Sequence, residues 1–258
     1  MPTIIITGAR GGIGAATALR FCKAGWNVVG TSRDRNSDWP LDITSEAECH
    51  ALVEQVVAQF GSLDAVFNNA GFAQMGAFDN FSLDAHRDIL AVNLIGPMTL
   101  TGAALPVMRA QASGTLVHMG SVVSHLPAPF MGSYAASKHG LEGFSKTLDH
   151  ELQGSGLRSI LIRAGFMRSN IGSNTAFANA EIDRSPEELS VTQSVEAALA
   201  KADDPDVVAE AVFRACTVGY TAPVIDAGRE ARMLALLSTF LPRRIFAKAL
   251  RKQFGLSP

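Results

Sequence analysis

The chain has 258 residues, of which 47% are hydrophobic and 18% charged, with 23 glycines and a formal net charge of −2. This composition provides for a sizeable core, excludes an intrinsically disordered chain and argues against nucleic acid as the main partner. Its three cysteines, Cys22, Cys49 and Cys216, are odd in number and far apart in the sequence, so they form neither a disulfide framework nor a metal spacing and suit a reducing compartment such as the cytoplasm. No signal peptide or membrane span is expected.

Short apolar runs alternate with longer helical patterns up to residue 165. Strands are predicted over residues 2–7, 26–32, 63–69, 114–120 and 157–165, and helices over 14–25, 44–60, 82–110 and 133–152. The strands are almost continuously apolar, which is typical of a parallel sheet buried on both faces. The alternation predicts one α/β domain over residues 1–258, a Rossmann-like, doubly wound parallel sheet with helices on both faces. Beyond it we expect a substrate lid over about 166–200, a helix near 205–218 and a weak strand over 220–226.

A glycine-rich turn, TGARGGIG, joins the first strand to the first helix. Such a turn brings backbone N–H groups and the positive end of a helix up to a phosphate, so it favours a nucleotide over a merely tight turn. The spacing of its glycines is not G-x-G-x-x-G. It has the Thr-Gly-x-x-x-Gly-Ile-Gly form of the short-chain dehydrogenase/reductase family, which the chain resembles. The resemblance implies cofactor contacts by Gly8, Gly12, Ile13 and Gly14.

The end of the second strand, WNVVGTSRD, bears on the identity of the cofactor. A nicotinamide cofactor without a 2′-phosphate usually meets Asp or Glu at this point, and the chain has Ser32 there. A serine followed by Arg33 leaves room for a 2′-phosphate and neutralises it, and Arg10 in the glycine turn approaches the same group. These residues predict NADP(H). Asp34, one position later, is the counter-argument.

The stretch LDIT contains Asp42 and Ile43, which fit the pair of residues that contacts adenine in the family. The alternative is a helix N-cap cluster, with Thr44 or Ser45 ahead of two glutamates. Both interpretations can hold at once.

Four further motifs follow in the order and spacing of the family, so that the resemblance extends from residue 3 to about 170. NNAG closes the strand at 63–69, VNLIG supplies Asn93, VHMGSV supplies Ser121, and SYAASKHG supplies Tyr134 and Lys138. The resemblance implies further cofactor contacts by Asn69, Ala70, Gly71, Gly165, Met167 and Ser169, with Ala164 standing where the family usually has proline.

Tyr134 and Lys138 lie four residues apart, which places both side chains on one face of a helix. An acid/base that acts on an alcohol needs a pKa near the working pH, whereas free tyrosine has a pKa of about 10. A cation one turn away favours the phenolate. The resemblance implies that Lys138 also binds the nicotinamide ribose, that Ser121 hydrogen-bonds the substrate oxygen, and that Asn93 holds a water linking Lys138 to solvent. No cluster with metal-ligand spacing is found.

The segment 122–133 is rich in apolar residues, which favours a hydrophobic substrate, while Arg168 is a candidate clamp for a small carboxylate. A C-terminal tail over about 229–256 combines apolar residues at helical spacing with basic ones. Residues 229–258 contain seven basic residues and one acidic residue, a net charge of +6, which leaves −8 for residues 1–228. Three roles remain open for this tail: a helix over the pocket, a dimer contact or a peripheral membrane element.

These features predict an NADP(H)-dependent oxidoreductase that interconverts a secondary alcohol and a ketone or aldehyde. A weaker resemblance to 17β-hydroxysteroid and retinol dehydrogenases favours a steroid-, retinoid- or lipid-like substrate. The alternative is a non-catalytic NADP(H)-binding sensor, which has no need for all four catalytic residues. Epimerases and dehydratases of this fold usually carry Gly-x-x-Gly-x-x-Gly and a longer substrate domain. By analogy, helices around 82–110 and 133–154 predict a homodimer or homotetramer.

Overall fold

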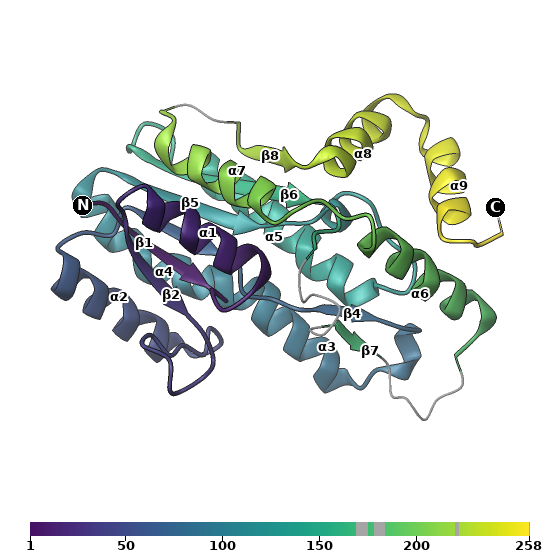
Figure 1. Cartoon of the computed structure of the whole chain (residues 1–258), viewed down its shortest axis with the longest axis horizontal. Coiled ribbons are helices and arrows are strands. Elements are labelled where there is room, and N and C mark those ends of the chain that lie inside the picture. The colour runs from purple at the N-terminus through teal and green to yellow at the C-terminus, as the bar shows by residue number, and fades with distance from the viewer. Residues whose placement is uncertain (169–174, 178–183, 220–221, 258) are drawn as a thin grey trace.

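The centre of the protein is a parallel sheet with the strand order β2–β1–β3–β5–β6–β8 (Figure 1). The structure is a computed structural model that describes the chain except residues 169–174, 178–183, 220–221 and 258. The strands are β1 (Thr3–Thr7), β2 (Asn27–Thr31), β3 (Ala65–Asn68), β5 (Gly114–Met119), β6 (Leu157–Ala164) and β8 (Val224–Ala227). All neighbouring strands pair in parallel, which confirms the predicted doubly wound α/β sheet.

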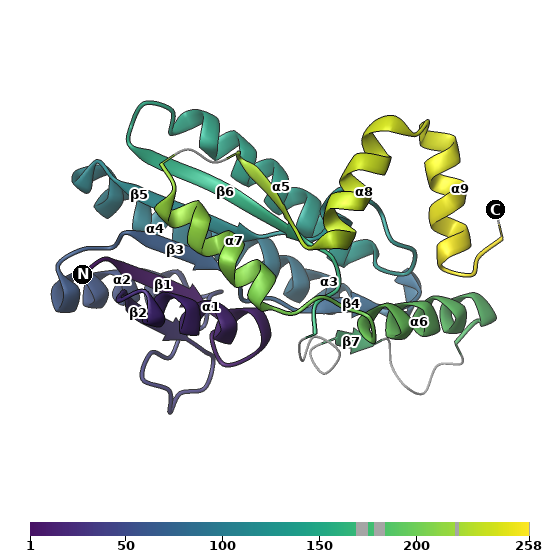
Figure 2. The same cartoon turned by 45° about the horizontal axis from the view of Figure 1, so that its top comes forward.

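Helices cover both faces of this sheet (Figures 1 and 2). The described helices that pack on it are α1 (Gly12–Lys23) and α7 (Asp206–Thr217) on one face, and α2 (Glu46–Phe60), α4 (Gly96–Gln111) and α5 (Gly132–Glu151) on the other. Successive strand residues point to opposite faces. Ile4 and Ile6 accordingly join the core under α1 and α7, while Ile5 joins the core under α2 and α4. This double burial explains the unbroken apolar run of β1.

Two short strands and a π-helical turn are among the features of the fold that were not predicted. Short strands β4 (Ala73–Met75) and β7 (Thr175–Phe177) pair with each other in a separate parallel sheet. The predicted helix over 82–110 is divided into α3 (Leu83–Leu90) and α4 by a π-helical turn, Ala91–Ile95. Such π-turns are frequent at functional sites. The turn places Asn93 in the interior.

The continuous stretch Leu83–Gln111 is the one described helix long and apolar enough to cross a membrane by length and composition. This is weak evidence for a span, because the core helix of a globular protein passes the same test. Leu100, Ala104 and Met108 of α4 are completely buried in the core beneath α2 and α5.

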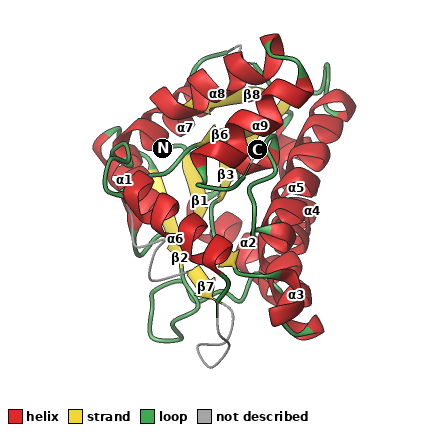
Figure 3. Ribbon diagram, turned by 90° about the vertical axis from the view of Figure 1, so that its right-hand side faces the viewer, coloured by secondary structure: helices red, strands yellow, loops and turns green. Residues whose placement is uncertain are grey.

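The segment after β6 closes the end of the sheet where the strands have their carboxyl ends. It contains β7, α6 (Pro186–Leu199), and the tail helices α8 (Arg229–Phe240) and α9 (Arg243–Gln253). Figure 2 shows α8 leaving the body and α9 returning toward α6, and Figure 3 looks onto this end. Sites of parallel α/β sheets lie at the carboxyl ends of the strands, so this segment covers the region where a site is expected.

Candidate active site

The turn between β1 and α1 has the geometry of a phosphate cradle. Gly8 and Gly12 have φ angles of 67° and 51°, a conformation that favours glycine. A Cβ at Gly14 would overlap the carbonyl oxygen of Gly8. The first residues of α1 include no acidic side chain, and its N-cap, Gly11, makes no side-chain capping bond. The N–H groups of this helix end are therefore left for a ligand.

The NNAG segment after β3 is fastened to the glycine turn. The Asn69 side-chain amide donates to the carbonyl oxygens of Thr7 at 2.8 Å and Gly8 at 3.3 Å. The Thr7 hydroxyl oxygen accepts from the backbone N–H groups of Asn69 and Ala70, each at 2.9 Å. A Cβ on Gly8 would come within 3.1 Å of the Ala70 Cα. The two loops thus form one rigid rim.

Asn93 is fully buried, and its side chain holds the π-turn to the neighbouring elements. Its amide nitrogen donates to the Phe72 carbonyl oxygen at 2.9 Å and to the Ser137 hydroxyl at 3.2 Å, while its amide oxygen accepts from the Phe72 N–H at 3.1 Å. A Cβ on Gly71 would lie 2.8 Å from that amide oxygen, so the glycine permits this approach. Asn93 therefore connects the NNAG segment to α5, and its role toward a water stays a prediction.

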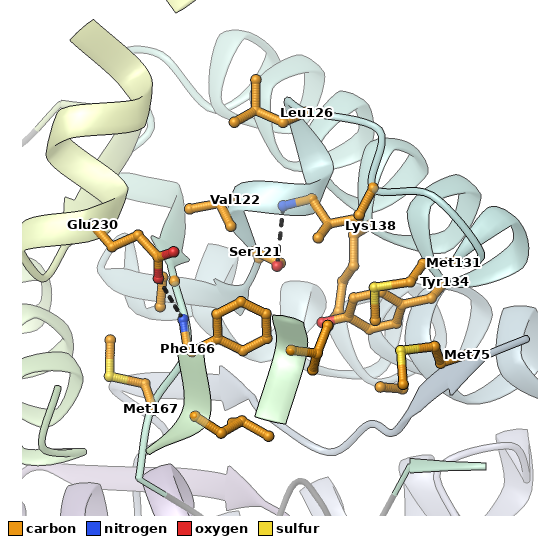
Figure 4. Close-up of a pocket in the computed structure, with 18 of the residues that line it drawn as sticks. Met75, Ser121, Val122, Leu126, Met131, Tyr134, Lys138, Phe166, Met167 and Glu230 are labelled. Atoms are coloured by element: carbon orange, nitrogen blue, oxygen red, sulfur yellow. Dashed lines mark hydrogen bonds between the residues drawn. The ribbon is translucent and has the colours of Figure 1, made fainter. Parts of the chain in front are cut away.

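Ser121, Tyr134 and Lys138 meet where β5 ends and α5 begins (Figure 4). Ser121 is the N-cap of a short 3-10 turn, Val122–Ser124, and its hydroxyl oxygen accepts from the Val123 N–H at 3.1 Å. Lys138 is 5% exposed, and its ammonium donates to the Met119 carbonyl oxygen at 2.8 Å. The same ammonium lies 5.8 Å from the centre of the Tyr134 ring. The predicted juxtaposition of the three side chains is present in the structure.

Burial governs the protonation of the two titratable groups. It raises the pKa of Tyr134, against the opposing effect of a hydrogen bond with the Ser121 side chain. It lowers the pKa of Lys138 to about 8. Both shifts disfavour the charged form, as expected for groups removed from water. In the chain by itself, burial therefore outweighs the lowering of the Tyr134 pKa that the spacing to Lys138 predicts.

The predicted 2′-phosphate corner lies at the exposed end of β2. Arg10 forms an ion pair with Asp34. Asp34, the residue that argues against NADP(H), therefore holds one of the two cations predicted to bind the phosphate. The Ser32 hydroxyl accepts from the Asp34 N–H at 3.3 Å. Arg33 is exposed and has no ion-pair partner among the described residues, whereas Arg35 is held by Glu48. Arg33 is thus the available cation of this corner.

Asp42 and Ile43 have structural partners. Asp42 accepts from the N–H and the hydroxyl of Thr44 at 2.9 and 2.6 Å, and Ser45 caps α2. Ile43 is 5% exposed and packs against Gly96, where a Cβ would lie 2.9 Å from the isoleucine. The helix-cap alternative is therefore present, and the adenine contact stays a prediction.

The loop after β6 is fastened by a residue that the sequence did not reveal. Glu230, in the first turn of α8, accepts from the Phe166 N–H at 3.0 Å, and a Cβ on Gly165 would overlap the same carboxylate (Figure 4). Nothing in the sequence pattern singles out Glu230, because its partner lies 64 residues earlier. Met167 is 2% exposed. Ser169 lies outside the described residues.

Arg168, the candidate clamp for a carboxylate, pairs with Asp204 at 2.8 Å on the surface. Its guanidinium is therefore held by another exposed side chain.

A cavity of about 320 Å³ joins these groups. At one end it reaches Ile13, Asn69 and Gly71 beside the glycine turn, and along one wall it exposes Ser121, Tyr134 and Lys138. Its other walls are mostly apolar and include Met75, Val122, Leu126, Met131, Phe166, Met167, Val195, Leu199, Leu234, Leu250 and Phe254. Leu234 and Leu250 belong to the tail. The tail therefore covers the pocket in the structure, which is the first of the three roles that the sequence left open.

The chain is similar to known dehydrogenases. Residues 2–179 match the family described as short chain dehydrogenase. Over 180 residues the chain is 31% identical to 3-oxoacyl-(acyl-carrier-protein) reductase FabG of Salmonella typhimurium, covering 65% of this chain and 74% of that protein. It is 28% identical to dehydrogenase/reductase SDR family member 7B of Rattus norvegicus, covering 68% of this chain and 61% of the relative.

Solved structures extend the likeness to the C-terminal segment. A short-chain dehydrogenase from Streptomyces avermitilis superposes with a TM-score of 0.83 at 26% identity, covering 98% of this chain and 97% of the other. A 3-ketoacyl-(acyl-carrier-protein) reductase from Brucella melitensis, complexed with NADH, has a TM-score of 0.72 at 23% identity, covering 87% and 95%. The second likeness shows the fold alone.

Proposed function

The chain belongs to the short-chain dehydrogenase family, and we propose that it is an NADP(H)-dependent oxidoreductase that interconverts a secondary alcohol and a ketone or aldehyde. The observation that carries this proposal is the meeting of Ser121, Tyr134 and Lys138 at the wall of a cavity that reaches the glycine turn. A hydroxyl donor, an acid/base and a cation at one point are what proton transfer to or from an alcohol oxygen requires.

The residues around the cavity fit a dinucleotide. Gly8, Gly12, Gly14 and the start of α1 would hold the pyrophosphate, since side chains there would fill the cradle. Lys138 would hold the nicotinamide ribose, and the backbone at Gly165 and Met167 would lie along the ring. When bound, the reduced nicotinamide supplies the hydride.

In carbonyl reduction, Tyr134 donates its phenolic proton to the substrate oxygen while the carbonyl carbon receives hydride. Ser121 donates a hydrogen bond to the same oxygen and stabilises the charge that develops there. The phenolate that remains is stabilised by the Lys138 ammonium. A phenol stays protonated at neutral pH, which is the state that a proton donor needs. An NADP pool that is kept reduced would favour reduction as the direction in the cell.

The choice of NADP(H) rests on Arg33, which is exposed and unpaired among the described residues. We expect purified protein to bind NADPH more tightly than NADH, and Arg33→Ala to weaken NADPH alone by about tenfold, the loss of one charge-assisted contact. Arg35→Ala is the matched control. It removes the same charge at a position two residues later, where the guanidinium is held by Glu48. Equal binding of NADPH and NADH by the wild type would contradict the choice.

The apolar walls support a hydrophobic, steroid-, retinoid- or lipid-like substrate. A screen of ketones and aldehydes of increasing apolar size, followed by NADPH absorbance, tests this class. We expect kcat/KM to rise with apolar size and to fall when the substrate carries a carboxylate. Tight NADPH binding without turnover of any carbonyl compound would favour the non-catalytic sensor.

We also propose that the protein is a homo-oligomer and that it is located in the cytoplasm. Ile95 and Met98 are 52% and 39% exposed on the α3–α4 surface, where burial against a second copy would remove them from water. The three cysteines are free thiols, as in a reducing compartment. Light scattering of the wild type and Met98→Glu tests the interface, with a lower mass expected for the variant.

A further inference from the structure

The outer face of α8 is apolar and lies in water. Met233, Leu236, Leu237 and Phe240 are 54%, 61%, 37% and 76% exposed, and their spacing places them on one side of the helix. Ile245 in α9 is 55% exposed. These five side chains, the apolar tail face, are among the fourteen large apolar side chains that are exposed in the described chain. Their gathering within thirteen residues marks an interaction surface rather than scatter.

Basic side chains accompany the apolar tail face. Arg244, Lys248 and Lys252 of α9 are exposed and have no carboxylate partner among the described residues. The net charge of +6 for residues 229–258 contrasts with −8 for the rest of the chain. Helices that lie in the surface of an anionic membrane combine apolar side chains with lysine and arginine in this way.

We propose that α8 and α9 dock the protein peripherally on an anionic lipid surface, with the apolar tail face among the acyl chains and the basic side chains of α9 at the headgroups. The opposite net charges of the tail and of the rest of the chain orient the molecule, because anionic headgroups attract the tail and repel the acidic body. A second copy of the chain fits the face poorly. A symmetric contact would bring two tails of equal charge together, and one helix face is small beside the ~800 Å² that each partner of a stable dimer buries.

The docking face adjoins the cavity. Leu234, on the buried side of α8, and Leu250 of α9 line it, so the same two helices form a wall of the cavity and the lipid-facing surface. The part of the inference that concerns the substrate rests on the proposed function. A hydrophobic ketone dissolved in the bilayer enters the cavity beside the tail without crossing water.

Vesicle flotation of the full chain, without cofactor or substrate, tests docking independently of catalysis. We expect the wild type to float with phosphatidylcholine vesicles that contain phosphatidylglycerol, and much less with phosphatidylcholine alone. Leu236→Asp/Phe240→Asp should reduce the floating fraction by at least about tenfold, and Lys248→Glu/Lys252→Glu should remove the dependence on anionic lipid. Leu19→Asp is the control, since Leu19 is 55% exposed on α1, away from the tail.

The results separate docking from its alternatives. A wild type that remains unbound to anionic vesicles overturns the proposal, and so does an aspartate variant that floats as well as the wild type. A halved mass of Leu236→Asp/Phe240→Asp in light scattering without vesicles would assign the face to a second copy instead. Circular dichroism and NADPH binding check that the variants fold. If turnover exists, the aspartate pair should slow reduction of a vesicle-dissolved ketone and leave that of a water-soluble ketone unchanged.

Discussion

The cavity has two kinds of wall. The segment up to the end of β6 contributes Ser121, Tyr134 and Lys138, the last hydrogen-bonded to the Met119 carbonyl, together with many apolar side chains. The segment from α6 onward contributes apolar and polar side chains from helices whose opposite faces meet water, and its Glu230 carboxylate accepts a hydrogen bond from the loop after β6. The family match covers the first segment and ends at residue 179. In the proposed function the chemistry resides in the part built on fixed motifs, and both parts shape the pocket for the substrate.

The strongest test of the fixed wall is Tyr134→Phe. The phenylalanine keeps the ring that packs in the cavity and removes the proton donor, so we expect kcat to fall by about 10²- to 10⁴-fold. NADPH affinity should change little, because the phenol acts on the substrate oxygen. Steady-state kinetics with NADPH titration checks both. A variant that keeps more than a tenth of the wild-type kcat would place the proton donor elsewhere.

Lys138→Met tests how much the burial of the Lys138 ammonium lowers the free energy of unfolding. The pKa of Lys138 is about 8 in the folded chain, against an ordinary value of 10.5. Below pH 8 the lysine is charged in both states, and its burial penalty is present in full. Between pH 8 and 10.5 the unfolded chain binds the proton that the folded chain has released, so the wild type gains stability as the pH rises.

The gain amounts to about 3 kcal/mol by the end of this interval. Methionine has no proton to lose, so the difference in the free energy of unfolding between wild type and Lys138→Met should shift toward the wild type from pH 8 to 10.5. Urea denaturation at several pH values measures the difference, and the comparison cancels the other lysines that titrate there. A difference that does not change with pH would mean that the ammonium is well solvated.

The features that the sequence could predict are those with a local pattern, and the features that it missed depend on contacts between distant parts of the chain. The buried strands and the glycine turn carry local signals, since Ile4 to Ile6 and Gly8 to Gly14 each have a pattern of their own, and both were predicted. Strands β4 and β7 have three residues each and exist only because they pair with each other. The π-turn at Asn93 leaves the apolar periodicity of its neighbours almost intact, so 82–110 looked like one helix.

The contact of Glu230 and the direction of the Tyr134 pKa shift could not be predicted from the sequence, because both depend on tertiary contacts. The partner of Glu230 is a backbone N–H that only the folded chain brings near, and burial, not the spacing to Lys138, decides the direction of the tyrosine shift. Local motifs predicted which residues gather at the site, while the tertiary contacts decide how each of them behaves.

Glu230→Ala tests the connection between the two walls. The change leaves the Phe166 N–H without its acceptor and frees the first turn of α8, which should cost about 1–2 kcal/mol of the stability of this region. Hydrogen exchange should show faster exchange at Phe166 and along α8, with the amides of β1 and β3 unchanged. Glu230→Gln keeps an acceptor oxygen and should restore most of the protection. Equal exchange in wild type and alanine variant would show that the other contacts of the tail hold it without Glu230.

The smallest expected effect lies at the predicted 2′-phosphate corner, which is exposed although it belongs to the segment before the end of β6. Asp34 holds Arg10 there, and hydrogen bonds from the Asn36 backbone and from Arg10 lower its pKa, so it is charged at neutral pH. Asp34→Asn releases Arg10 and removes a charge that repels a phosphate. We expect NADPH to bind roughly two- to fivefold more tightly and NADH not to gain, since exposed ion pairs are weak. Weaker binding of NADH by Asp34→Asn, with NADPH unchanged, would instead identify Asp34 as the partner of the ribose hydroxyls.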